Sequence, residues 1–311
     1  MNSYLKSVTT AFLIATLVMA VSIGVLGSAP TLPQVIGKPD VSSIKSVTHE
    51  GITQLVLSNT DGNISIATHD GDSVSVTADI RAFVKRSETV ATANAYMETL
   101  MANTVDNGVL NVVTEPGSRP AGVYLFVLYT VQVPRGTDIT VNAENGNVTL
   151  NEGCGRVEVR GHNTDIDIAR PLGEVTAESI NGRIRLAGAP AGGHLSTVNG
   201  NVEADVEGGF LEASTANGLI FAKLLKPVID GCRLTSQNGG IRLHMKEGSS
   251  ASIDARTGRG NIYTDLPLTP AQDGEPHRQV QGTIGSGSGS ERARIEMDAL
   301  NGNIIIASTG I

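Results

Sequence analysis

Residues 145–150 read NGNVTL, and this phrase returns along the chain at a regular spacing. Copies that start with Asn-Gly or its equivalent begin at 145, 163, 181, 199 and 217, which are 18 residues apart. Later copies begin at 238, 259 and 301, at multiples of 21 residues. A short repeat at a constant period is typical of a solenoid, because each coil buries its apolar face only against its neighbours.

Each repeat contains two alternating segments that predict two short strands. In residues 145–162, Asn-Gly predicts a tight turn that the glycine's tolerance of positive φ permits. Val148 and Leu150 then alternate with polar residues, as do Val157 and Val159 after the bend NEGCG. We therefore predict an all-β fold, a single-chain β-solenoid or β-helix-like stack of short two-strand coils. In chain order, one inward column is Val148, Ile166, Ile184, Val202, Ile220, Ile241, Ile262 and Ile304.

Two other solenoid classes fit less well. A nonapeptide β-roll also uses two strands per turn, but it requires an Asp-bearing glycine motif for calcium that this chain lacks. Pectin-lyase-like helices use a longer coil of three strands and gather acidic residues on one outer face. That class remains the secondary interpretation.

The composition supports short strands and excludes one class of partner. The 311 residues include 36 Gly, only 3% aromatic side chains and no Trp, which predicts a thin core. The formal net charge is -8, and the basic residues are dispersed along the chain. Because no positive stripe is available to neutralise phosphates, we expect no nucleic acid partner.

The N-terminal residues predict contact with a membrane. Residues 7–29 carry no charge and include AFLIATLVMAVSIGVLG, close to the roughly 20 apolar residues that cross a bilayer. Residues 1–29 are therefore either a membrane anchor or a signal peptide. Lys6 predicts that the preceding arm stays cytoplasmic. The body is thus exported: it is anchored outside the cytoplasm, or secreted or periplasmic if the segment is cleaved.

The remainder divides into a linker and one repeat domain. Residues 30–43 are rich in proline and lack a hydrophobic period, which predicts a semi-rigid spacer. Residues 44–311 form the β-strand-repeat domain. Within it, 44–134 is a less regular capping part and 135–311 is the regular solenoid.

One helix is expected in the capping part. Residues 87–103 have the Ala, Met and Leu content of a helix, with Ser87 or Thr89 near the N-cap. Near residue 280 the repeat is obscured by a proline-containing loop and by GSGSGS at 285–290.

Several ordered phrases resemble a known family. The chain reads YTVQVPRGTDITVNAENGNVTL at 129–150 and closes with IGSGSG, ARIEMDAL and NGNIII. From about residue 45 to 311 it is similar to the bacterial putative-adhesin family of β-strand-repeat proteins, a domain of unknown function. The resemblance implies export and a repetitive β fold, and some relatives are associated with cell-envelope stress signalling. It supplies no catalytic residues.

The cysteines and histidines predict no disulfide, metal site or cofactor. Cys154 and Cys232 lie four coils apart, about 19 Å along the axis at the usual strand spacing, whereas a disulfide requires Cα atoms within about 7 Å. The six histidines lack the spacing of a zinc site.

Outward positions predict ion pairs between coils and one candidate binding column. Asp165 and Asp167 face Arg183 and Arg185, and Arg185 faces Glu203. Further along, the same column continues with Phe221, Arg242 and Tyr263. Two aromatic rings beside a guanidinium on a solvated face form either a ligand site or a cation–π stack that stabilises the sheet.

These observations favour a binding protein over an enzyme. We expect a non-enzymatic, exported β-solenoid that binds a cell-surface or envelope polymer in the manner of an adhesin. The alternative is an envelope scaffold or stress-signalling accessory that contacts a membrane protein. A polysaccharide lyase or hydrolase is suggested only by analogy between solenoids.

Overall fold

Strands form nearly all of the regular structure, as the alternating pattern predicts. The computed structural model describes residues 39–85, 89–115, 117–226, 231–269, 277–285 and 292–309. The predicted anchor, residues 1–29, lies outside the described residues. In the described part of the chain, no helix is long and apolar enough to cross a membrane.

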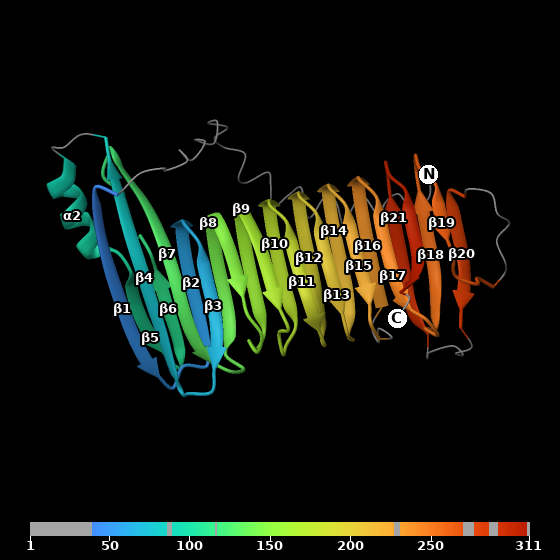
Figure 1. The fold of residues 1–311 in the computed structure, drawn as a ribbon, viewed down its shortest axis with the longest axis horizontal. Coiled ribbons are helices and arrows are strands. Elements are labelled where there is room, and N and C mark those ends of the chain that lie inside the picture. The colour runs from blue at the N-terminus through green and yellow to red at the C-terminus, as the bar shows by residue number, and fades with distance from the viewer. Residues whose placement is uncertain are drawn as a thin grey trace. The chain divides into compact units, whose positions relative to one another are not determined.

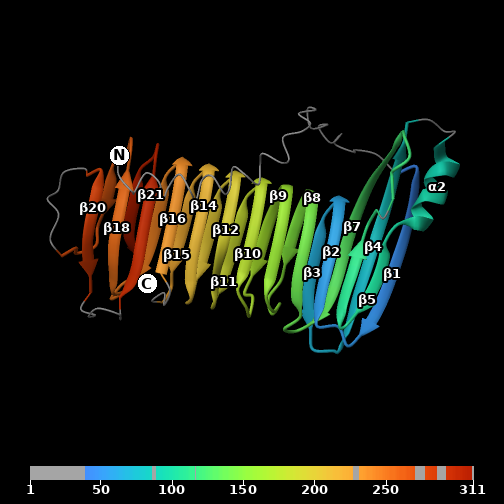
Figure 2. The same cartoon turned by 180° about the vertical axis from the view of Figure 1, so that it is seen from behind.

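The described strands form one continuous 22-stranded sheet that is folded into two facing layers, which we call the first and second sheets, with the core between them (Figures 1 and 2). In spatial order the first sheet contains β5 (Ala102–Asp106), β6 (Val109–Val113), β2 (Gln54–Asp61), β8 (Asp138–Leu150), β9 (Val157–Ala169), β10 (Val175–Asn181), β12 (Gly192–Asn199), β14 (Phe210–Asn217), β16 (Gly231–Asn238), β21 (Ala293–Ala299), β18 (Ala251–Thr257) and β20 (Gln279–Ile284).

The second sheet runs alongside the first. It contains β1 (Val41–Glu50), β4 (Ser73–Val84), β7 (Val123–Pro134), β3 (Ile64–His69), the second halves of β8 and β9, β11 (Ile184–Ala189), β13 (Val202–Val206), β15 (Ile220–Leu224), β17 (Ile241–Lys246), β22 (Ile304–Thr309) and β19 (Ile262–Thr264). Neighbouring strands in the middle of both sheets are parallel, and antiparallel pairs occur toward the ends.

The predicted apolar columns form the core. Every member of the column from Val148 to Ile304 is buried, with an exposed fraction of 3% or less. On the facing sheet, Val157, Val175 and Leu211 are also buried. The two-strand coil and its inward register are therefore confirmed, and burial of these stacked side chains supplies the main stabilising term.

The order of the last coils differs from the chain order that we predicted. β21 pairs with β16 on one side and with β18 on the other, and β22 lies in the same way between β17 and β19. Both views show the red β21 between the orange β16 and β18. The C-terminal coil is thus inserted between two coils that precede it, and Ile304, not Ile262, stacks on Ile241.

Hydrogen bonds between asparagine side chains follow the same order of coils at the corner between the two sheets. Each Nδ2 donates to the Oδ1 of the preceding coil at 2.7–2.9 Å, and the ladder runs through Asn145, Asn163, Asn181, Asn199, Asn217, Asn238 and Asn301. Its first member, Asn145, donates to Asp61 at 2.9 Å. The ladder passes directly from Asn238 to Asn301.

The predicted helix is present, and two predicted boundaries differ. The helix α2 spans Val90–Thr99 with Thr89 at its N-cap, and it ends four residues before the predicted end at residue 103. It buries Ala93, Tyr96 and Met97 and packs against β1 and β4. Because β1 begins at Val41, the predicted linker 30–43 is wrong over its last three residues.

Candidate functional site

A groove of about 640 Å³ lies on the outer face of the second sheet, across β13, β15, β17 and β22. Figure 1 shows the first three of these strands in the half of the stack that contains the C-terminal coils. We call it the Arg242 groove, and its lining residues are Asn201, Val202, Glu203, Leu219, Ile220, Phe221, Gly240, Ile241, Arg242, Asn303 and Ile305.

The hollow follows from the side chains that successive coils place just after the Asn-Gly corner. Equivalent positions hold Asn201, Leu219, Gly240 and Asn303. Gly240 adds no side chain to this row, and a Cβ there would lie 2.9 Å from the Asn303 carbonyl oxygen and 3.6 Å from Leu219 Cδ2. Asn303 and Leu219, which is 56% exposed, therefore border the hollow on either side of Gly240. Two residues further along each strand, Glu203, Phe221, Arg242 and Ile305 are cross-strand neighbours and form the next row of the groove.

The predicted column of Phe221, Arg242 and Tyr263 is therefore partly wrong. Phe221 and Arg242 are neighbours, but Ile305 lies between Arg242 and Tyr263 because β22 is inserted there. Tyr263 is 47% exposed on β19, outside the groove lining, and its hydroxyl accepts a hydrogen bond from Asn261 Nδ2 at 3.1 Å. The predicted pair of rings flanking Arg242 does not form.

The groove also contains residues that the sequence did not predict. Asn201, Leu219, Gly240, Asn303 and Ile305 were not predicted as site residues. One signal was present in the sequence: the repeat at 301 begins with Asn, as does the repeat at 238, whereas the repeat at 259 begins with Arg. Continuity of the asparagine ladder therefore favours stacking 301 on 238.

Most charges beside the groove are already paired. Arg185 lies 3.4 Å from Asp167 and 4.0 Å from Glu203, as predicted. Lys223 lies 3.6 Å from Asp205, with its Nζ 5.1 Å from the centre of the Phe221 ring. The Phe221 ring also meets His244 edge-on at 5.2 Å. The aromatic surface is thus held in place by polar neighbours.

Arg242 differs from these residues, because it forms no hydrogen bond or ion pair with any described residue although it is exposed. The side-chain amides of Asn201 and Asn303 add hydrogen-bond donors to the groove. Asn201 Oδ1 accepts from Leu219 N, and Asn303 Oδ1 accepts from Asn261 N, both at 2.9 Å. Their Nδ2 groups have no partner among the described residues. The groove therefore offers a cation and two amide donors that no described residue pairs with, beside the apolar lining residues Leu219, Phe221 and Ile305.

The described residues contain no group of three or more His, Cys, Asp or Glu that would hold a metal ion. Cys154 and Cys232 are both buried free thiols. Burial raises the pKa of Cys154 to about 11 and that of Cys232 to about 12. Such thiols are poor nucleophiles, and neither lines the groove.

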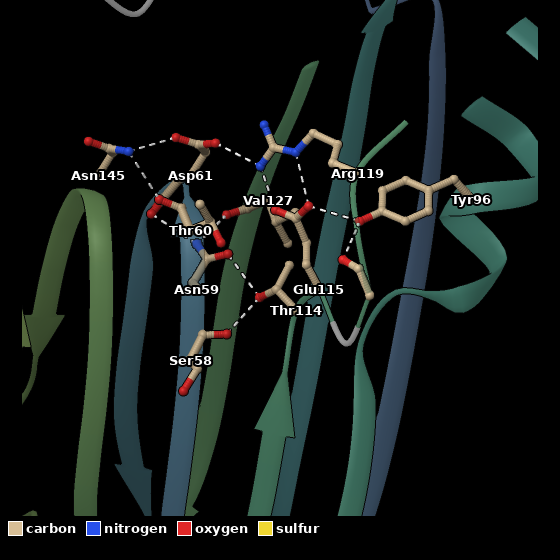
Figure 3. A network of polar contacts seen from close by, with 12 residues as sticks. Ser58, Asn59, Thr60, Asp61, Tyr96, Thr114, Glu115, Arg119, Val127 and Asn145 are labelled. Carbon is tan, nitrogen blue, oxygen red and sulfur yellow. Dashed lines mark hydrogen bonds and ion pairs between the residues drawn. The ribbon is translucent and has the colours of Figure 1, made fainter. Parts of the chain in front are cut away.

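A second polar cluster, the Arg119 network, lies toward the other end of the stack (Figure 3). Arg119 donates to Asp61 and to Glu115, both at 2.9 Å, and the Tyr96 hydroxyl donates to Glu115 at 2.9 Å. The network joins helix α2, the segment after β6 and strand β2, and through Asp61 it reaches Asn145. The polar groups of the network are hydrogen-bonded to one another, which indicates a structural role.

The pKa shifts within the network agree with that role. Burial pushes the pKa of Glu115 upward, but its hydrogen bonds and charge contact with Arg119, helped by the Tyr96 hydroxyl, outweigh burial and leave the pKa below its ordinary value. Burial, together with the hydrogen bond to Glu115, raises the pKa of Tyr96 to about 12. Glu115 is therefore a stable anion held by Arg119.

The model of the family Toastrack DUF4097 matches residues 52–307 of this chain. The chain belongs to the Toastrack family. This match confirms the predicted membership of a β-strand-repeat family of unknown function and the β-solenoid-like fold.

Solved structures similar to this Toastrack protein are distant in sequence. A putative adhesin from Bacteroides fragilis is 14% identical with a TM-score of 0.46, covering 86% of this chain and 97% of that one. A putative adhesin from Parabacteroides distasonis is 9% identical with a TM-score of 0.33, covering 88% and 99%. A putative lipid binding protein from the same species is 10% identical with a TM-score of 0.39, covering 88% and 99%. No curated protein matches this Toastrack chain.

Proposed function

We propose that this protein is a non-enzymatic, exported β-solenoid that binds a cell-surface or envelope polymer through the Arg242 groove. The observation that carries the proposal is the groove itself. It is an open hollow on a sheet face, where one guanidinium and two amide donors have no partner among the described residues and lie beside the exposed Leu219. Shallow, open grooves with donors along their length suit an extended polymer better than a small enclosed ligand.

Export is part of the same proposal. Its support is the uncharged stretch of residues 7–29, whose length approaches that of a bilayer span. Such a segment would deliver the repeat domain to the side of the membrane where envelope polymers are found. Protease accessibility of the repeat domain in intact cells tests this part: the domain should be degraded by added protease, and protection until the cells are lysed would contradict export.

Binding is tested by sedimentation with lipid-free envelope polymer, so that residues 7–29 contribute no membrane attachment. The full chain should sediment with the polymer, and the double variant F221A/R242Q should bind at least tenfold more weakly. R183Q is the matched control, because Arg183 is exposed outside the groove lining and its side chain has no hydrogen-bond or ion-pair partner among the described residues. Equal sedimentation of the double variant and the wild type would contradict the proposed site.

A further inference from the structure

Arg242 is one of several described arginines without an ion pair, and it is the one that lines the groove. Eight other arginines lie within 4.0 Å of a carboxylate oxygen, namely Arg81, Arg119, Arg160, Arg170, Arg185, Arg233, Arg256 and Arg294. Arg242 has no such partner among the described residues, in a chain whose net charge is -8. Among the described residues, Glu203 supplies the one carboxylate in the groove lining, and it lies 4.0 Å from Arg185. Two strand spacings, about 10 Å, separate Glu203 from Arg242 along the row.

The remaining polar groups of the groove favour a ligand rich in acceptors. The Oδ1 atoms of Asn201 and Asn303 are occupied by backbone N–H groups, which leaves the Nδ2 donors for a ligand. A guanidinium binds a carboxylate through two parallel hydrogen bonds, which a neutral hydroxyl cannot match. Phe221 and Ile305 flank Arg242 on the neighbouring strands and offer apolar contact to the C–H face of a sugar ring.

The topology argues against a peptide as the occupant. β13, β15, β17 and β22 are each paired on both sides, so their backbone groups are used within the sheet. A peptide that binds by strand addition needs a free sheet edge, and none lies in the groove. From Asn201 to Asn303 the groove crosses three strand spacings, about 14 Å, which suits consecutive units of a linear glycan.

We infer that the Arg242 groove recognises a polyuronate, a linear glycan whose sugars carry carboxylates, with Arg242 binding the carboxylate and Phe221 contacting the ring. This inference rests on the proposed function and specifies its ligand class. Binding involves no covalent step.

The test compares one glycan backbone with and without its charge. Binding of the full chain to polygalacturonate and to its fully methyl-esterified form is measured by calorimetry. The free acid should bind about 10–150 fold more tightly, the range of a hydrogen-bonded charge. R242Q should lose that preference, R183Q should keep it, and F221A should weaken binding to both forms. Thermal melting confirms that each variant is folded.

The outcomes separate the two proposals. Equal binding of the acid and the ester, with no effect of R242Q, would overturn the polyuronate inference and leave polymer binding intact. Tighter binding of dextran sulfate than of polygalacturonate, with the same loss in R242Q, would overturn recognition of carboxylates. Binding of neither polygalacturonate form, while lipid-free envelope polymer still sediments the protein, would overturn the inference alone. Failure of that sedimentation as well would remove both proposals.

Discussion

At the residue scale, the Asn-Gly corner is held together by close stacking. We predicted that glycine serves a turn with positive φ, and Gly146 does have a φ of 132°. In the later coils, glycine is required at the corner for a different reason. A Cβ at Gly200 would lie 2.0 Å from the carbonyl oxygen of Gly182, and one at Gly218 would lie 1.9 Å from that of Gly200. The corner therefore excludes any side chain, because the coils approach too closely.

Replacement of one corner glycine should destabilise the whole stack. We expect G200A to lower the free energy of unfolding by about 1–3 kcal/mol, the usual cost of overpacking. Thermal or urea unfolding measures the change. G117A is the control, because Gly117 is exposed and a Cβ there meets nothing within 4 Å. Equal stability of the two variants would mean that the corner tolerates a side chain.

At the element scale, the inserted coil β21–β22 completes the Arg242 groove, because it brings Asn303 and Ile305 beside Arg242. An ion pair on the outer face of the first sheet supports the insertion: Glu296 of β21 lies 2.8 Å from Arg233 of β16. A chain that stacked its coils strictly in sequence would lack this contact and would not place Asn303 and Ile305 in the groove lining.

The insertion predicts which engineered cysteines can be joined. Asn301 donates to Asn238 at 2.8 Å, so N238C/N301C occupies equivalent corners of adjacent coils. One strand spacing, about 4.8 Å, separates these positions, which is within the Cα separation that a disulfide tolerates. We expect it to oxidise readily, as seen by a mobility shift without reductant. N238C/R259C should stay reduced, because two strand spacings, about 10 Å, separate those positions. The native thiols are buried and interfere little. Oxidation of N238C/R259C but not of N238C/N301C would contradict the insertion and show that the coils stack in chain order.

The Arg119 network should make stability depend on pH. The folded-state pKa of Glu115 is lowered, so its charge stabilises the fold above about pH 4.3, the unfolded value, and that contribution is lost as the pH falls through the folded value. E115Q should lower the free energy of unfolding by about 1.5–3 kcal/mol at pH 7.

Urea unfolding between pH 3 and pH 7 measures this dependence, and the E115Q curve should fall less steeply on acidification than that of the wild type. E144Q is the control, because Glu144 is exposed and has no ion pair among the described residues. Parallel pH curves for E115Q and the wild type would show that the network contributes nothing.

At the scale of the whole molecule, the sequence predicted the coil but not the order of the coils. Alternation of Val148 and Leu150 with polar residues specifies which face is buried, and the period specifies where each corner lies. Neither specifies which coil stacks on which, because Ile262 and Ile304 are equivalent as neighbours of Ile241. Two positions distinguish them: Asn301 extends the asparagine ladder, and Arg259 cannot. The groove was therefore predicted only through Phe221 and Arg242, which lie on coils that are consecutive both in sequence and in space.

The central claim, that the Arg242 groove contacts an envelope polymer, is tested most directly by site-specific photo-crosslinking in intact native cells. The crosslinking residue is placed at Leu219, which is 56% exposed in the groove, and for comparison at Leu172, which is 46% exposed outside it. Mass spectrometry and glycan analysis identify the adducts. We predict glycan adducts from position 219 and few from position 172. A single dominant membrane-protein adduct from position 219 would contradict the account and favour an accessory of an envelope complex.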